Sequence, residues 1–332
     1  MPDLKTRYLG LTLNNPIIVS SCGITGSREG VKRCAEAGAG AVVLKSLFEE
    51  LIVAESEILD RELLASEHPE ALEYLRADLG MRMGPRPYLA FIEAVKKDVD
   101  IPVIASVHCT SSKWWVSYAK NIENAGADAL ELNISHYPDS ETSPPGNVEK
   151  RYADIVRTVA GSVSIPVAAK VGHYFTSLAV FLESLARAGA RGLVLFNRYY
   201  NSDIDLARKT IVPAITMSGN EEMFVPLRWT GIMSKRLKNC DIAASSGIHN
   251  VKGIVKMIMA GASATQICSI LYRHGPEYVG LLAGQLNSWL ADNGFDAVSD
   301  IKGLAVSGGR EADMLKRIQY IQALDAASKY EY

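Results

Sequence analysis

Short apolar runs recur along the chain, and four of them follow the same small-residue turn. The turn is Ala-Gly-Ala, and its copies lie at residues 37–39, 125–127, 188–190 and 260–262. Glycine ends a helix readily because it adopts the left-handed backbone, and its small neighbours let the helix pack closely on the next strand. The pattern therefore predicts a repeated unit of helix, turn and strand.

Other apolar runs begin with Ile-Pro-Val or Ile-Ala-Ala and interleave with the first set. Together they predict eight strands, at residues 16–21, 41–46, 102–107, 128–133, 166–171, 192–197, 241–245 and 264–268. A segment that can form a helix follows each strand, and this alternation favours a parallel sheet. Eight units favour an α/β fold of the (β/α)8 type, a TIM barrel, over a doubly wound sheet. We expect a single domain spanning residues 1–332.

The segments outside this alternation also have expected roles. Residues 4–14 fit a small hairpin or plug under the barrel, and residues 311–329 fit a terminal helix. Two connections, residues 47–100 and 198–240, are much longer than usual βα loops. Long loops at the C-terminal face of a barrel commonly serve as lids or substrate loops. The alternatives are a surface insertion or a contact in a homodimer.

The composition narrows the function classes. The chain has 332 residues, 48% of them hydrophobic and 22% charged, with a formal net charge of −2. That balance offers no basic surface for nucleic acid, and we find neither a long apolar run for a membrane nor a signal peptide. The five cysteines show no metal-site spacing, so we expect a cytoplasmic protein with reduced thiols and no metal site. Cys22 and Cys109 have no neighbouring basic residue in sequence that would mark a nucleophile.

Polar residues follow the apolar runs where the strands are expected to end. The active site of such a barrel lies at the C-terminal ends of its strands. Two lysines, two asparagines and several small residues facing one space indicate a polar, planar ligand. The residues at these ends are Ser20, Ser21, Cys22, Gly23, Lys45, Ser46, His108, Asn133, His136, Lys170, Asn197, Arg198, Ser245, Ser246, Gly247, Cys268 and Ser269.

The last two strands add a phosphate signal. Ser246 and Gly247 precede a predicted helix, and Cys268 and Ser269 open the final connection. Backbone N–H groups at these positions commonly bind phosphate in barrels of this kind. One such site, with no G-x-G-x-x-G after a strand, predicts a mononucleotide cofactor rather than a dinucleotide.

Taken together, these segments resemble the class 1 FMN-dependent dihydroorotate dehydrogenases, from Asn15-Pro-Ile-Ile to Gly275-Pro276. The motifs are Lys45-Ser46, Glu131-Leu-Asn-Ile-Ser135, Lys170, Asn197, Ser246-Gly247-Ile248 and Cys268-Ser269. The resemblance implies oxidation of dihydroorotate to orotate in pyrimidine biosynthesis, or a related CH–CH oxidation. It implies that FMN contacts Ser20, Ser21, Gly23, Lys45, Ser46, Asn133, Lys170, Ser246, Gly247, Cys268 and Ser269. It implies that the substrate contacts Lys45, Asn133, Asn197 and Arg198.

The chain departs from that family where the chemistry takes place. His136 stands where the family has its catalytic cysteine, and residues 77–84 lack the asparagine of the family's substrate loop. Two of the four asparagines that surround orotate are missing, so we expect weak or absent turnover of dihydroorotate. His136 is the candidate base, because an imidazole titrates near neutral pH. Lys170 is the second candidate catalytic residue, with its charge at the flavin edge.

Three functions remain open at this stage. The first is an FMN oxidoreductase acting on a cyclic dihydropyrimidine. The second is a flavin-binding protein without that activity, such as a subunit of a redox complex. The third is a phosphate-binding barrel lyase in which Lys170 forms a Schiff base. The cysteine spacing does not provide an iron–sulfur site, so a cluster would have to lie on a redox partner subunit.

Overall fold

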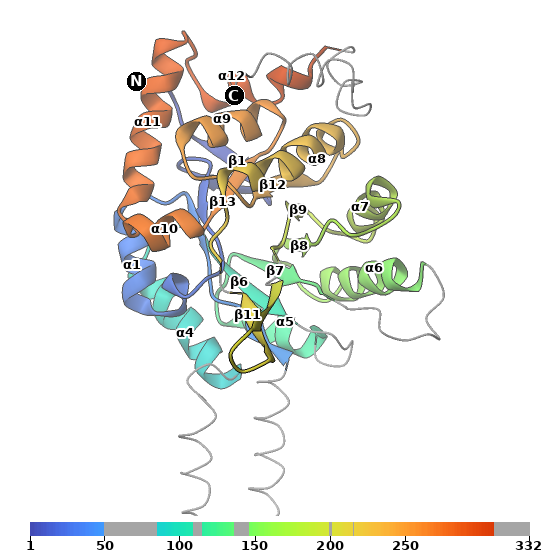
Figure 1. Cartoon of the computed structure of the whole chain (residues 1–332). Helices are drawn as coiled ribbons and strands as arrows, with labels where there is room; N and C mark the ends of the chain where they lie inside the picture. The colour runs from blue at the N-terminus through green and yellow to red at the C-terminus, as the bar shows by residue number, and fades with distance from the viewer. Residues whose placement is uncertain (50–84, 109–114, 136–145, 199–200, 215, 309–332) are drawn as a thin grey trace, which may run out of the picture.

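The computed structural model describes residues 1–49, 85–108, 115–135, 146–198, 201–214 and 216–308 (Figure 1). Several predictions lie outside these residues. They concern His136, Cys109, the loop at 77–84 and the terminal helix at 311–329.

Eight parallel strands close into a barrel, which confirms the predicted fold class. They are β3 (Ile17–Val19), β4 (Ala41–Val43), β6 (Val103–His108), β7 (Ala129–Asn133), β8 (Val167–Val171), β9 (Gly192–Leu195), β12 (Asp241–Ser245) and β13 (Ala264–Ile267). Each pairs with the next in chain order, and β13 pairs with β3 to close the ring. The short β5 (Leu47–Phe48) runs beside the end of β6.

A helix follows each strand, and Figure 1 shows these helices around the outside of the barrel. They are α1 (Arg28–Glu36), α4 (Pro85–Asp98), α5 (Trp115–Asn124), α6 (Asn147–Ala160), α7 (Leu178–Arg187), α8 (Phe224–Ser234), α9 (Val251–Met259) and, after the short α10 (Ser269–His274), α11 (Tyr278–Asp292). The chain continues through α12 (Val298–Ile301). Within the described residues, no helix is long and apolar enough to cross a bilayer.

The repeated Ala-Gly-Ala turns have one backbone geometry. Gly38, Gly126, Gly189 and Gly261 have φ values of 84°, 91°, 113° and 107°. These angles lie in the left-handed region, which a residue with a Cβ adopts only at a cost. The recurrent glycine is therefore the residue that ends each of these helices and turns the chain toward the next strand.

The interior of the barrel changes from apolar to polar along its axis. At the N-terminal ends of the strands, Ile18, Val43, Ile104 and Val194 form a buried core inside the barrel. A hairpin of β1 (Thr6–Tyr8) and β2 (Leu11–Leu13) adds Tyr8, Leu9 and Leu13 to this core, which confirms the predicted plug.

The polar half of the interior follows from the period-two alternation of side chains along a strand. In β7, Ala129 belongs to the interior core, and Glu131 and Asn133 point to the same side farther along. In β8, Lys170 follows Ala168 in the same way. Polar groups are thereby directed to the C-terminal end of the barrel.

The long connection after β9 contains regular structure of its own. The strands β10 (Asn201–Asp205) and β11 (Thr210–Ala214) form an antiparallel hairpin, and the 3-10 turn η3 (Asn220–Met223) precedes α8. Residues 216–218, between the hairpin and η3, line the candidate site described next. The predicted substrate loop therefore does reach the C-terminal face.

Candidate functional site

A cavity of about 500 Å³ lies at the C-terminal ends of the strands. Every residue predicted to contact the cofactor or the substrate lines it, whereas His136 lies outside the described residues and His108, at the end of β6, is not part of the lining. The structure therefore brings together groups that are up to 249 positions apart in sequence. They are Ser20, Ser21, Gly23, Lys45, Ser46, Asn133, Lys170, Asn197, Arg198, Ser246, Gly247, Cys268 and Ser269.

Lys170 is held at the base of the cavity by a buried polar network. Its Nζ donates to Ser20 Oγ at 3.1 Å and to Gln266 Oε1 at 3.2 Å. Glu131 Oε1 lies 3.6 Å from the same nitrogen, and Glu131 Oε2 accepts from Gln266 Nε2 at 2.6 Å. Lys170 is only 6% exposed and Glu131 only 1%. An unpaired charge at such depth costs several kcal/mol, so these partners are what allow the ammonium to be there.

Two asparagines form a pair at the ends of β7 and β9, the strands on either side of the one that carries Lys170. Asn197 Nδ2 donates to Asn133 Oδ1 at 2.8 Å, which orients both amides. The Asn133 amide nitrogen and the Asn197 amide oxygen remain as one donor and one acceptor. A ligand with adjacent C=O and N–H groups matches that arrangement.

Three serines connect the ends of β3, β4 and β6. Ser46 Oγ lies 3.1 Å from Ser21 Oγ and 2.8 Å from Ser106 Oγ. The Tyr88 hydroxyl donates to the Ser106 carbonyl at 3.1 Å and accepts from its N–H at 2.9 Å. This series of hydrogen bonds fixes the loop that carries Lys45. The Lys45 side chain is exposed to the cavity and has no bonded partner among the described residues.

The loop after β12 has a backbone suited to a phosphate. Ser246 and Gly247 have φ values of 82° and 70°, so two successive residues are left-handed. A Cβ at Gly247 would lie 2.4 Å from the Met223 nitrogen. The backbone N–H groups of Gly247 and Ser269 have no hydrogen-bond partner within the described part of the chain. Such unpaired donors beside small residues form an anion-binding concavity.

A hydrogen-bond chain supports the same end of the cavity. The Ser218 hydroxyl donates to Ser269 Oγ at 2.9 Å and lies 2.9 Å from His249 Nε2. Because Ser218 gives its hydrogen to Ser269, His249 Nε2 must be the donor to Ser218. Burial, and then the charge of Arg273, lower the pKa of His249, which favours this neutral ring. Ser269 accepts in this chain, so its own hydrogen is free for a ligand.

Arg198 is placed differently from the other predicted ligands. Its Nε donates to Glu222 Oε2 at 2.7 Å, and its two terminal nitrogens donate to the carbonyl and hydroxyl of Thr216. The guanidinium therefore anchors the connection between β11 and η3 to the end of β9. Its predicted contact with a substrate has to use the N–H groups that remain.

Several lining residues were missed in the sequence. Gln266 could have been found, because it alternates with Ala264 on the inward side of β13. Thr216 and Ser218 come from the long connection, and Tyr272 comes from α10. No local pattern indicates that these three reach the cavity.

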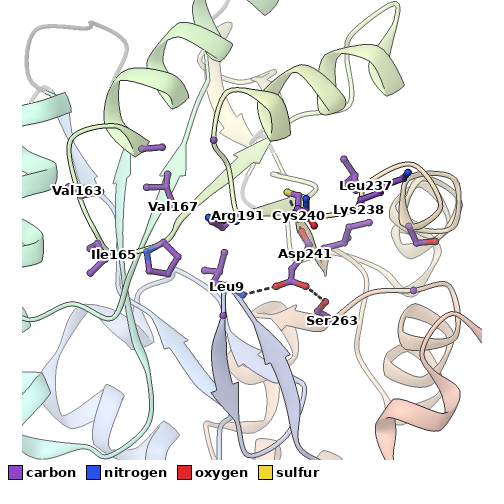
Figure 2. Close-up of a pocket in the computed structure, with 18 of the residues that line it drawn as sticks. Leu9, Val163, Ile165, Val167, Arg191, Leu237, Lys238, Cys240, Asp241 and Ser263 are labelled. Atoms are coloured by element: carbon purple, nitrogen blue, oxygen red, sulfur yellow. Dashed lines mark hydrogen bonds between the residues drawn. The ribbon is translucent and has the colours of Figure 1, made fainter.

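A second cavity, of about 640 Å³, lies at the opposite end of the barrel (Figure 2). Asp241 lies at its centre, where the carboxylate accepts from the Leu9 N–H and from Ser263 Oγ, both at 2.9 Å. Its main acidic group is thus used to attach the hairpin plug to β12. Asp241 in the larger cavity therefore holds the fold together. None of the polar residues predicted at the C-terminal strand ends lines this cavity.

Comparisons with known proteins agree with the geometry. The family model for dihydroorotate dehydrogenase matches residues 79–290. The chain is 28% identical over 319 residues to the catalytic subunit of dihydroorotate dehydrogenase B (NAD(+)) from Thermoplasma acidophilum, covering 92% of this chain and 100% of that protein. The corresponding subunit from Methanocaldococcus jannaschii is 28% identical, with coverage of 91% and 98%. The NAD-dependent dihydropyrimidine dehydrogenase subunit PreA of Escherichia coli (strain K12) is 24% identical, with coverage of 95% and 80%.

Proposed function

The chain belongs to the dihydroorotate dehydrogenase family, and we propose that it is an FMN-dependent enzyme that oxidises or reduces a CH–CH bond in a cyclic dihydropyrimidine. Oxidoreductase chemistry on CH–CH bonds follows from the family. The cofactor and the substrate class are the proposed part. The observation that carries the proposal is the single cavity that gathers the predicted ligands from the strand ends.

The residues present fit a flavin mononucleotide. Gly247 and Ser269 offer unpaired backbone N–H groups, and the Ser269 hydroxyl can donate to a phosphate. These two backbone donors belong to the loops after β12 and β13, and both loops line the same cavity, which suits one phosphate. FMN, when bound, supplies the hydride acceptor or donor.

Lys170 has the position and the partners for a group that stabilises negative charge. Its ammonium lies at the cavity floor, and Ser20, Gln266 and Glu131 hold it in one place. A preorganised cation stabilises charge that develops during a reaction without reorganising. We propose that this is its contribution to catalysis.

The substrate would lie against the asparagine pair and Lys45. The remaining amide donor of Asn133 and acceptor of Asn197 suit the C=O and N–H groups of a pyrimidine ring. Lys45, which has no bonded partner among the described residues, offers its ammonium group to a carbonyl oxygen of that ring. His136 follows Asn133 by three residues in sequence, and we propose that it exchanges the ring proton.

The lyase alternative is less well supported. A Schiff-base lysine needs a free lone pair directed at the substrate. Lys170 Nζ already donates to two oxygens and faces a carboxylate. The three relatives described above are dehydrogenases, and each is named as a subunit. We propose that this chain also has a partner subunit, which would carry electrons to or from the flavin.

The test begins with the purified protein. A yellow protein whose heat-released flavin is FMN by mass spectrometry is the expected result. Anaerobic titration should then bleach the flavin with a dihydropyrimidine such as 5,6-dihydrouracil, and weakly if at all with dihydroorotate. Fast bleaching by dihydroorotate, with tight binding, would contradict the substrate part. A colourless protein that does not take up FMN would contradict the whole proposal.

The base is tested separately. His136→Ala should abolish bleaching by the active substrate while leaving FMN content unchanged. His274→Ala is the matched control, because His274 is exposed and stacks on Tyr278 outside the cavity. Bleaching that survives His136→Ala would assign the proton transfer to another group.

A further inference from the structure

Three cationic side chains line the cavity at the N-terminal end of the barrel. Arg191 precedes β9, Lys238 lies in the loop between α8 and β12, and Lys302 follows α12. Asp241 is the one carboxylate in the described lining, and both of its oxygens already accept hydrogen bonds from within the fold. The lining therefore carries an excess of positive charge.

These cations keep hydrogen-bond donors for a ligand. Neither Arg191 nor Lys238 has a side-chain hydrogen-bond or ion-pair partner among the described residues, and both side chains are exposed. Lys302 Nζ donates to Ser263 Oγ at 2.7 Å, and an ammonium has two further hydrogens to donate. Since the fold leaves these donors unused, an anion that enters the cavity can accept from all three side chains.

The loop between α8 and β12 adds backbone donors. The N–H groups of Lys238, Asn239 and Cys240 have no hydrogen-bond partner within the described part of the chain, and all three residues line the cavity. Arg236 of the same loop is paired with Glu183, so that cation serves the fold, whereas Lys238 does not. Unpaired N–H groups on successive residues beside a cation suit a phosphate group.

The rest of the cavity has room for the body of a ligand. Its volume of about 640 Å³ lies within the roughly 300–1,000 Å³ of small-molecule sites and is more than a lone phosphate fills. In Figure 2, Val163 and Ile165 lie to one side of Arg191, and the loop that carries Lys238 lies to the other. Asn239 adds an amide to the same lining, which favours a body with hydrogen-bonding groups over a hydrocarbon chain.

We propose that this cavity is a second ligand site and that it binds a nucleoside phosphate. The phosphate accepts from Arg191, Lys238 and Lys302, and the base packs on the apolar side of the cavity. The proposal rests on the unpaired cations, the backbone donors and the size of the cavity. It is independent of the proposed flavin chemistry, because the cavity lies at the opposite end of the barrel from the candidate active site.

The primary experiment is a calorimetric titration of the purified full chain, saturated with FMN, in a buffer without divalent cations. ADP is the nucleoside phosphate probe, pyrophosphate supplies the anionic group alone, and decanoate supplies an anion with a hydrocarbon body. We expect about one ADP per chain, bound more tightly than the other two probes, with an affinity that falls as the salt concentration rises. No binding of ADP, tighter binding of either other probe, or release of FMN by ADP would each overturn the proposal.

Variants assign the binding to this cavity. Arg191→Met and Lys238→Met should each weaken ADP binding about 10-fold, since each removes a charge-assisted hydrogen bond. Lys97→Met is the matched control, because Lys97 is an exposed cation on α4 outside the lining of the cavity, and it should bind ADP like wild type. Wild-type affinity in both Arg191→Met and Lys238→Met would contradict the assignment.

Acetylation of lysines in the wild-type protein, read by peptide mass spectrometry, locates the ligand without any variant. ADP should protect Lys238 from acetylation and should leave Lys97 as reactive as before. Protection of Lys45 in place of Lys238 would put the ligand in the cavity at the C-terminal face and overturn the proposal. This footprint decides the matter if a variant does not fold, and it gives the same answer if the chain takes up no FMN.

Discussion

Asn197 Nδ2 donates to Asn133 Oδ1 across 2.8 Å, and this bond joins the ends of β7 and β9 above the cavity. The two strands are not neighbours, because β8 lies between them. The bond therefore sets the orientation of both amides relative to the whole cavity wall. Each amide keeps one group for a ligand.

Asn197→Ala tests this relationship. We expect substrate affinity to fall about 10-fold, since a lost hydrogen bond of this kind is worth roughly 1–1.5 kcal/mol. Flavin content should not change, because Asn197 is proposed to contact the substrate alone. The measurement is anaerobic flavin reduction against substrate concentration. Asn14→Ala, at an exposed position near the hairpin plug, is the control and should match wild type.

Glu131→Gln should destabilise the fold by roughly 3–5 kcal/mol, because the buried ammonium of Lys170 loses its counter-charge. The double variant with Lys170→Met should recover part of that loss. Urea unfolding followed by circular dichroism measures both. Glu183→Gln breaks an exposed ion pair with Arg236 and should cost less than about 1 kcal/mol. Equal losses for the two single variants would show that burial does not set the strength of these pairs.

Gly247→Val should prevent the proposed flavin phosphate from binding and should destabilise the loop. The new Cβ would meet the Met223 nitrogen at 2.4 Å on a residue with φ of 70°. We expect flavin content below about one tenth of wild type, equivalent to more than about 1.4 kcal/mol of binding. Gly284→Ala is the matched control, because a Cβ there meets nothing within 4 Å and the residue lies inside α11. Full flavin occupancy in Gly247→Val would place the phosphate elsewhere.

His249 should make stability depend on pH near neutrality. Burial and Arg273 lower its pKa in the folded protein, whereas the unfolded chain takes up the proton near about 6.5. Its contribution is therefore complete above that value and is lost as pH falls toward the folded-state pKa. Urea midpoints at pH 7.5 and 5.5 should differ less in His249→Gln than in wild type. His173, whose pKa is also lowered by burial, leaves a residual slope in both proteins.

The sequence predicts the barrel well because two repeated patterns, the apolar runs and the Ala-Gly-Ala turns, agree over most of the chain. Apolar runs mark the strands, and the left-handed glycines mark the helix ends. The site residues follow from the same strand ends, since parallel strands deliver their last residues to one face. Gln266 points into the barrel two residues after Ala264 in β13, so the same pattern could have identified it, but it was not among the predicted site residues.

The remaining features depend on contacts between distant segments. The bond from Ser218 to Ser269 joins residues 51 positions apart, and the Tyr272 bond to Gly23 joins residues 249 apart.

The hairpin plug has a consequence for synthesis of the chain. Leu9 is bonded to Asp241, 232 residues later, and β3 completes its pairing only with β13. During synthesis the hairpin therefore emerges well before β12 and β13, the strands with which these contacts are made. Tyr8, Leu9 and Leu13 cannot be buried in the barrel interior until those strands have been made, so their burial depends on closure of the ring.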